Sequence, residues 1–376
     1  MQINPFITTG YISGEYFCDR EKETEHLISL IKNGNNVTLV SQRRIGKTGL
    51  IQHVFEKLKT DTELTTIYVD IFSTRSIEDF IKQISEAILK KFPDKTTIGK
   101  TFWEFIKRLR PLITYDNITG DPQIQINYQT ENEKTHTLQN IFELLEKQKN
   151  RVIIAIDEFQ QITEYPEKNL EANLRSQIQF LKKTSFIFCG SKRKILFDMF
   201  SNAKRPFYMS TQFMLLDKID RAKYADFIEN MFKKYDITIE KEATELILNL
   251  SKVYTFYTQK LCNRIFSYKP DIVCNKNVLS SFSEILEENR LSYLQLRELL
   301  TKAQWNYLIA VAKEDNLSKI TGQNFLMKNK IGTASNSKRL MEALTEKDLI
   351  SELPALNETN YTINDVFLFH WLRETY

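Results

Sequence analysis

The sequence of 376 residues has little glycine, proline, cysteine or histidine, and each shortage excludes a class of protein. Its 10 glycines and 8 prolines are too few for a collagen-like or linker-like tract, and we find no repeat of fixed period. The 4 cysteines stand far apart, without a Cys-x-x-Cys pair, and the 4 histidines show no spacing suited to zinc. We therefore expect neither a disulfide framework nor a structural metal.

Long apolar runs and a large excess of one charge are missing as well. No stretch approaches the roughly 20 apolar residues that span a bilayer, and residues 1–10 lack the basic and then apolar layout of a signal peptide. The 52 basic residues exceed the 48 acidic ones by only 4, too few to indicate a nucleic acid or a membrane as partner. The hydrophobic fraction of 42% is that of a soluble globular protein, which we expect to be cytoplasmic.

Short apolar runs alternate with longer helical patterns from about residue 21 to 215. Near-continuous apolar runs are typical of buried parallel strands, and they predict strands at residues 36–40, 66–71, 152–156, 185–189 and 212–216. Between them, apolar residues repeat on one helical face at residues 48–58 and 77–89. This order predicts an α/β fold in which helices cover a parallel sheet.

The pattern changes twice more along the chain. A turn-rich stretch between two β-prone runs predicts an inserted hairpin at about residues 111–128. Helical patterns then predict an all-α lid without further strands, at residues 222–234, 241–250, 258–267 and 278–291. Short helices followed by two β-prone pieces, at residues 349–352 and 360–363, are typical of a winged helix. We thus predict domains at residues 1–216, 217–300 and 301–376.

A polar loop joins the first predicted strand to the helix that follows, as a Walker A loop does. It reads Ser41-Gln42-Arg43-Arg44-Ile45-Gly46-Lys47-Thr48 and is followed by Gly49. Such a loop presents backbone N–H groups and a helix N-terminus to a polyphosphate, so glycine is favoured at the closest approach, where Gly46 stands. Lys47 would contact the β- and γ-phosphates, and the Thr48 hydroxyl would ligate Mg²⁺. Ser41 replaces the glycine common at the first position, and a chance match of a polar loop is the alternative.

The strand predicted at residues 152–156 ends in two carboxylates, Asp157 and Glu158, as a Walker B strand does. A buried strand of this kind brings Asp157 to the edge of the sheet, where it can hold Mg²⁺, while Glu158 can polarise the attacking water. A strand capped by acidic residues is common by itself, but here a Walker A loop lies about 110 residues upstream, in the right order. We therefore take Glu158 and Lys47 as catalytic candidates.

A third apolar strand, at residues 185–189, leads to Ser191 and Lys192. This position resembles sensor 1 of additional-strand P-loop ATPases, where a polar residue contacts the γ-phosphate or the attacking water. Ser191 is our third catalytic candidate, ahead of Lys192. Ser191 would serve equally well as the N-cap of the next helix.

In this order, the motifs resemble those of the archaeal-type ATPase family within the AAA+/STAND P-loop proteins, which is also widespread in bacteria. The resemblance runs from Asn4-Pro5-Phe6 to the closing segment at residues 361–373 and includes Thr119-Gly120-Asp121-Pro122 of the hairpin. It implies a P-loop NTPase domain of AAA+/additional-strand type, an α-helical lid and a winged helix. It also implies ATP or ADP and Mg²⁺ as ligands, and it puts Phe17 and Arg20 in an N-terminal box beside the adenine.

Departures from the family pattern bear on function. Members often carry Pro-Leu-Tyr-Gly-Arg after sensor 1, whereas here Arg205 begins a similar stretch that ends without the arginine. Arg205 is then a candidate for γ-phosphate contact. The lid motif Gly-x-Pro appears as Val253-Tyr254-Thr255, which leaves the coupling of the lid open. Arg43 and Arg44 would either contact phosphate or a neighbouring surface, or lie in solvent.

We predict an ATP-binding, Mg²⁺-dependent ATPase of low turnover that acts as a slow nucleotide-driven switch. One alternative is a DNA-binding initiator- or transposition-regulator-like ATPase, and another is a nucleotide-bound scaffold that does not hydrolyse. Residues 301–376 hold 9 basic and 9 acidic residues, so this segment lacks the charge usual in DNA modules, although Ser337-Lys338-Arg339 favours DNA contact.

The winged helix also carries an apolar cluster near its end. Its members are Phe367, Phe369, Trp371 and Leu372. The cluster predicts a surface that packs on a neighbouring domain, a protein partner or a second copy. Alternatively, these residues form the core of the module itself.

Overall fold

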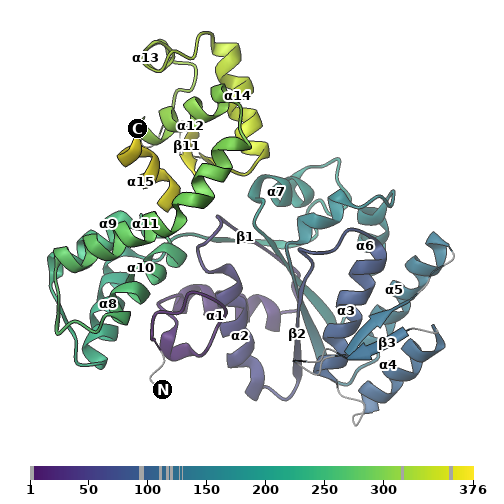
Figure 1. Cartoon of the computed structure of the whole chain (residues 1–376). Coiled ribbons are helices and arrows are strands. Elements are labelled where there is room, and N and C mark those ends of the chain that lie inside the picture. The colour runs from purple at the N-terminus through teal and green to yellow at the C-terminus, as the bar shows by residue number, and fades with distance from the viewer. Residues whose placement is uncertain are drawn as a thin grey trace. The chain divides into compact units, whose positions relative to one another are not determined.

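The computed structural model describes residues 4–92, 97–109, 112–115, 118, 122–126, 128, 130–314, 317–354 and 359–376. It divides into two compact units (Figure 1). One is Gly10–Lys218, and the other joins Met1–Thr9 to Ile219–Tyr376. A further division of the second unit into lid and winged helix stays a proposal.

A parallel sheet forms the centre of the first unit and confirms the predicted α/β fold. Its strands lie in the order β2-β5-β6-β1-β7, with bounds Leu64–Asp70, Arg151–Asp157, Thr184–Gly190, Val37–Ser41 and Gln212–Leu216. All four neighbouring pairs are parallel, so the five strands end at the same edge of the sheet. β6 lies between β1 and β5, and it is this additional strand that separates the P-loop strand from the acidic strand.

Helices cover both faces of this sheet (Figure 1). On one face lie α1 (Glu21–Lys32) and α2 (Lys47–Lys57). On the other lie α3 (Ile77–Lys91), α5 (Glu131–Glu146) and α6 (Leu170–Ile178), whose apolar stripes share one core with β2, β5 and β6. α7 (Arg193–Ser201) adds Leu196, Met199 and Phe200 to the same core. Helices alternate with the strands of the sheet along this part of the chain, as the sequence pattern predicts.

The predicted hairpin is present in the described residues. β3 (Leu112–Tyr115) pairs antiparallel with β4 (Pro122–Gln125), after helix α4 (Thr97–Arg108). The buried Ile124 anchors it, and the backbone N–H of Ile124 donates to Glu86 of α3 at 2.8 Å. Thr119, Gly120 and Asp121 of the family motif lie outside the described residues.

Helices dominate the second unit, which begins with α8 (Arg221–Lys234), α9 (Lys241–Leu250), α10 (Thr255–Ser267) and α11 (Asn275–Glu298). The expectation that strands stop here is wrong, because β8 (Thr238–Ile239) pairs in parallel with β9 (Ile272–Val273). Two residues a strand are too few to give a periodic signal. None of the helices among the residues described above is both long and apolar enough to cross a bilayer.

Residues 4–9 belong to this second unit, whereas we predicted them to be part of the first domain. The reason is packing: Phe6 is buried against Phe232 of α8 and Phe266 of α10. Two side-chain hydrogen bonds add to this packing: the Asn4 amide donates to the carbonyl of Asn263, and the Asn263 amide donates to the carbonyl of Phe6.

The last part of the unit has the order of a winged helix. Three helices come first: α12 (Lys302–Glu314), α13 (Gln323–Lys328) and α14 (Ala334–Glu346). The antiparallel strands β10 (Ile350–Pro354) and β11 (Thr359–Ile363) follow, and α15 (Val366–Thr375) ends the unit.

The apolar cluster lies on α15, and all four of its residues are buried. Phe367 packs on Tyr257 of α10, with ring centroids 4.8 Å apart, and Trp371 packs on Trp305 of α12. Phe367 thus packs on the predicted lid, as expected of a surface for a neighbouring domain, and Trp371 packs in the core of the winged helix itself. The expectation that the cluster is exposed to a protein partner or a second copy is wrong, because these contacts bury it.

Candidate functional site

The loop between β1 and α2 turns sharply at its end. Gly46 is the N-cap of α2 and has a φ of 97°, a left-handed conformation that favours glycine. Arg44 is also left-handed, with a φ of 65°. After Gly46 the helix begins at Lys47, so the loop and the N-terminus of α2 form one continuous stretch of backbone suited to an anion.

Lys47 and the two carboxylates at the end of β5 meet at this edge of the sheet. The Lys47 ammonium nitrogen lies 3.2 Å from Oδ1 of Asp157 and 3.7 Å from Oε1 of Glu158. Lys47 and Asp157 are both buried, with 8% and 4% of their surface exposed. Burial by itself lowers the pKa of Lys47, but the negative charge around it outweighs burial and raises that pKa. Lys47 is therefore a buried cation, held by the acidic pair.

Asp157 is surrounded by hydrogen-bond donors. Thr48 and Tyr68 donate their hydroxyls to Oδ2, at 2.8 and 2.9 Å, and the Cys189 thiol donates to Oδ1 at 3.3 Å. Burial works to raise the pKa of Asp157, but Lys47 and these donors lower it below the usual value. Burial also raises the pKa of the Cys189 thiol well above its usual value, so Cys189 stays protonated and acts here as a donor.

Glu158 is held by a separate group of donors. Its oxygen Oε2 accepts from the Ser191 hydroxyl at 2.7 Å, from the Ser191 backbone N–H at 3.1 Å and from the Gln160 amide at 2.6 Å. The backbone of Glu158 is left-handed, with a φ of 57°. Such a conformation is uncommon for a residue other than glycine and is often found at functional sites. The structure thus brings Ser191 to the carboxylate that we predicted as the catalytic base.

The other predicted nucleotide contacts lie around the same loop. Arg20 is buried, pairs with Glu23 at 2.8 Å and donates to the carbonyl of Ile45 at 3.4 Å, so it supports the loop. Phe17 stacks on His53 of α2, with ring centroids 4.4 Å apart, and lies beside Gly49.

The remaining loop residues differ in exposure. Ser41 is buried at the end of β1, and its hydroxyl oxygen has no hydrogen-bond partner among the described residues. Gln42 is half-buried and Ile45 is buried, while Arg43 and Arg44 are exposed. The two arginines are therefore accessible to a phosphate or to another surface.

Two weaker candidates are engaged in ion pairs elsewhere. The Lys192 ammonium lies 2.5 Å from Glu164. Arg205 pairs with Glu171 at 2.5 Å and lies 3.8 Å from Asp198 of α7. These pairs tie both cations to the segments that follow β5 and β6, so in this conformation neither reaches the acidic pair.

Sequence reasoning missed three residues that contact the acidic pair: Tyr68, Cys189 and Gln160. Tyr68 lies on β2, and the pairing of β2 with β5 places it opposite Ala155, two positions before Asp157. No local pattern specifies which strands pair. Gln160 alone left a local signal, because it stands two residues after the predicted catalytic Glu158.

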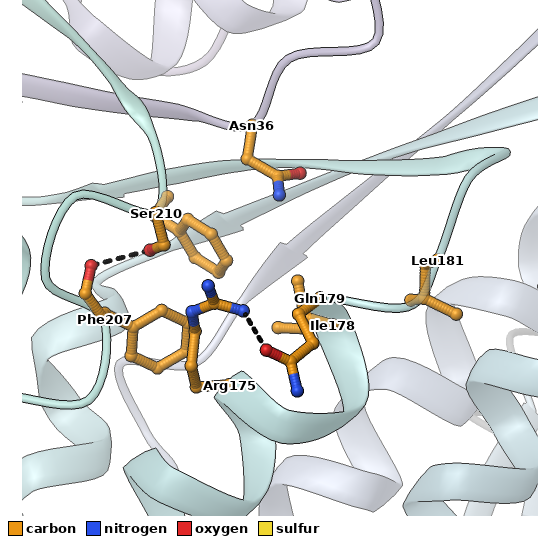
Figure 2. Close-up of a pocket in the computed structure, with 8 residues that line it drawn as sticks. Asn36, Arg175, Ile178, Gln179, Leu181, Phe207 and Ser210 are labelled. Atoms are coloured by element: carbon orange, nitrogen blue, oxygen red, sulfur yellow. Dashed lines mark hydrogen bonds between the residues drawn. The ribbon is translucent and has the colours of Figure 1, made fainter.

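A cavity of about 180 Å³ lies at the opposite edge of the sheet (Figure 2). Asn36 and Ser210, which precede β1 and β7, line it together with Phe207, Arg175 and Gln179. Arg175 donates to Gln179 at 3.1 Å within it. Because this edge carries the starts of the strands, the cavity is separate from the P-loop.

The residues at the P-loop edge fit a nucleotide with a hard cation. Among the described residues, no group of three or more His, Cys, Asp or Glu side chains could hold a metal ion by itself. A magnesium ion bound together with phosphates needs only one or two protein oxygens. The Thr48 hydroxyl and the Asp157 carboxylate, 2.8 Å apart, can supply these oxygens.

Comparisons with known proteins agree with this geometry. The sequence model of a family described as an ATPase domain predominantly from Archaea matches residues 17–255, and that of a probable winged helix domain matches residues 291–374. An uncharacterized ATP-binding protein of Methanocaldococcus jannaschii is 26% identical over 259 residues, which cover 62% of this chain and 69% of that protein.

Solved structures share the fold at low identity. A Walker-type ATPase of Pyrococcus abyssi has a TM-score of 0.69 at 17% identity and covers 98% of this chain and 99% of its own. The Aeropyrum pernix ORC2 protein, in its ADPNP-ADP complexes, has a TM-score of 0.61 at 15% identity, with 99% and 96% covered. The Aeropyrum pernix ORC1 protein in complex with DNA has a TM-score of 0.53 at 14% identity, with 96% and 93% covered.

Proposed function

The chain belongs to the family of ATPase domains found predominantly in Archaea, and from that premise we propose that it hydrolyses ATP slowly, with Mg²⁺, as a nucleotide-driven switch in the cytoplasm. The products would be ADP and phosphate. The proposal assigns binding to the P-loop and its flanking residues, and chemistry to Lys47, Glu158 and Ser191.

The observation that carries this proposal is the meeting of the P-loop with the acidic pair. Lys47 and Thr48 lie within 3.2 Å of Asp157, and Lys47 lies 3.7 Å from Glu158. In this arrangement Lys47 would direct its charge at the phosphates, and Thr48 and Asp157 would hold the cation. Bound Mg²⁺ supplies the neutralisation of phosphate charge that phosphoryl transfer needs. Glu158 would orient the attacking water and accept its proton.

Two contacts favour a low turnover. Lys47 is paired with two carboxylates, so it has to leave Asp157 before it can reach a phosphate. Three donors converge on Oε2 of Glu158, which leaves Oε1 as the oxygen that can receive a proton. Binding is thereby coupled to a rearrangement of buried charges, as expected of a switch.

Phosphate release by the purified chain tests the proposal. We expect slow release that requires Mg²⁺ and is abolished by a chelator. Tight ATP binding without any release over many hours would instead support the non-hydrolysing scaffold.

A second candidate is a DNA-binding regulator of the initiator or transposition type, and exposed basic residues favour it. Lys338 and Arg339 on α14 are exposed. The preceding residue, Ser337, is buried, and its hydroxyl is hydrogen-bonded to that of Tyr307. The Aeropyrum pernix ORC1 protein, which has a similar fold, was solved in complex with DNA. The zero net charge of residues 301–376 keeps this candidate second.

A protein partner or a second copy would have to use the exposed face of the winged helix, because Phe367, Phe369, Trp371 and Leu372 are buried. Titration of the full chain with duplex DNA at two salt concentrations separates the cases. Contacts to phosphates weaken steeply as salt rises, whereas apolar protein contacts do not.

A further inference from the structure

Gln160 follows the catalytic candidate Glu158 two residues later in the chain and contacts its carboxylate. It belongs to the 3-10 helix η3 (Phe159–Glu164) that follows β5. Only 2% of Gln160 is exposed, and its amide nitrogen donates to Oε2 of Glu158 at 2.6 Å. Among the described residues this is the one hydrogen bond that the Gln160 amide nitrogen donates, so the carboxylate sets the orientation of the amide.

Gly190 makes the space that Gln160 occupies. A Cβ atom on Gly190 would lie 1.8 Å from Oε1 of Gln160 and 2.9 Å from its Cδ, and its three closest contacts are all atoms of Gln160. The φ of Gly190 is not in the left-handed region, so backbone freedom does not explain the glycine. The absence of a side chain at the end of β6 therefore serves the placement of the Gln160 amide.

The same glycine precedes Ser191, the second donor to Glu158. The Ser191 hydroxyl and backbone N–H reach Oε2 at 2.7 and 3.1 Å. The ends of β5 and β6 thus enclose one oxygen of Glu158 from both sides, while Oε1 faces Lys47 at 3.7 Å. With Oε2 held, Oε1 is the oxygen of Glu158 that can act on a water once Lys47 turns to the phosphates.

We propose that Gln160 is a positioning residue for ATP hydrolysis: together with Ser191 it orients Glu158, and Gly190 is required because any side chain there displaces the Gln160 amide. This inference rests on the proposed ATPase activity. Gln160 touches neither the P-loop nor Lys47 in the described contacts, so it acts through Glu158 alone.

The test is a set of substitutions in the full chain, with kcat, KM for ATP and the affinity for ADP measured for each. Gln160→Ala should lower kcat about tenfold, the ratio expected for the loss of one hydrogen bond to a charged group. It should leave KM and the ADP affinity within about twofold, because it alters no binding contact. Gln161→Ala is the matched control: Gln161 is the next residue of η3, but its amide donates to Thr74 and Glu164.

A double variant isolates the mechanism. Gly190→Ala should lower kcat and the melting temperature in the parent, yet do neither in the Gln160→Ala background, where the colliding amide is gone.

Two outcomes would overturn the inference. One is a parental kcat in Gln160→Ala, and another is a Gly190→Ala defect of equal size in both backgrounds. A parent chain without ATPase activity would be a different result. It would refute the proposed function and, with it, the basis of this inference.

Discussion

Replacement of Lys47 by alanine should destabilise the nucleotide-free protein as well as weaken ATP binding. The Lys47 ammonium lies 3.2 Å from Asp157 and 3.7 Å from Glu158, and both Lys47 and Asp157 are buried. At 3.2 Å and an effective dielectric constant of about 20, the attraction between two unit charges is about 5 kcal/mol. Most of this attraction only compensates for the hydration that Lys47 and Asp157 lose on burial. The loss of stability in Lys47→Ala therefore comes mainly from the buried charge that remains without its partner.

The charge left behind in Lys47→Ala is the Asp157 carboxylate. Removal of one partner from a buried ion pair costs about 3 to 5 kcal/mol. Asp157 keeps its hydrogen bonds from Thr48, Tyr68 and Cys189, which favours the lower end of that range. For a unit of this size, a loss of about 3 kcal/mol lowers the melting temperature by roughly 6 to 12 °C.

The assay is thermal unfolding of the nucleotide-free chain, followed by calorimetric titration with ATP. Lys57→Ala is the control, because Lys57 is exposed at the end of the same helix. ATP at about 100 times its dissociation constant should stabilise the parent and the control by about 2.7 kcal/mol, and it should not stabilise Lys47→Ala. An unchanged ATP affinity would refute the assignment of the site, and an unchanged melting temperature would refute the buried pair.

Other substitutions test separate parts of the account. Glu158→Gln should keep ATP bound but abolish its hydrolysis, whereas Asp157→Ala should also lose the Mg²⁺ dependence of binding; parental phosphate release by Glu158→Gln would move the water-activating role to another residue. The pKa of Asp157 is lowered from its usual value of 3.8, although burial works to raise it. The ionised carboxylate therefore stabilises the fold above pH 3.8, and this stabilisation is lost as the pH falls through the lower pKa of the folded state. Asp157→Asn should therefore show a shallower loss of stability below about pH 4, and an acid limb identical to that of the parent would contradict the buried ion pair. In the winged helix, Lys338→Glu with Arg339→Glu should leave any DNA affinity of the full chain nearly unchanged; loss of submicromolar, salt-sensitive binding in this variant would favour the DNA-regulator candidate.

The sequence was sufficient for the parts of the fold that leave a local signal. Buried parallel strands read as apolar runs, so the bounds of β5 and β7 differ from the predicted ones by one residue or none at each end. Asp157 and Glu158 stand at the end of one such run, Lys47 follows the loop after another, and parallel strands bring those ends to one edge. Their proximity thus followed from the class of fold.

Contacts made across the sheet left no such signal. Tyr68 and Cys189 reach Asp157 only because β2 and β6 both flank β5, and a single sequence does not show which strands pair. The two-residue strands β8 and β9 are too short for any periodicity. The apolar cluster on α15 was predicted to be a site of packing, but the sequence does not tell whether the partner is another molecule or the same unit.

The central claim is that one site, built from Lys47, Asp157 and Glu158, both binds and hydrolyses ATP. A single-turnover experiment tests it most directly: a small amount of γ-labelled ATP is mixed with excess protein and Mg²⁺, and bound ATP and free phosphate are counted in the same samples over time. The account predicts that the parent converts its bound ATP slowly and completely, while Glu158→Gln holds the ATP intact and Lys47→Ala holds none. Bound ATP that stays intact in the parent, or phosphate released at equal rates by the parent and Glu158→Gln, would contradict it.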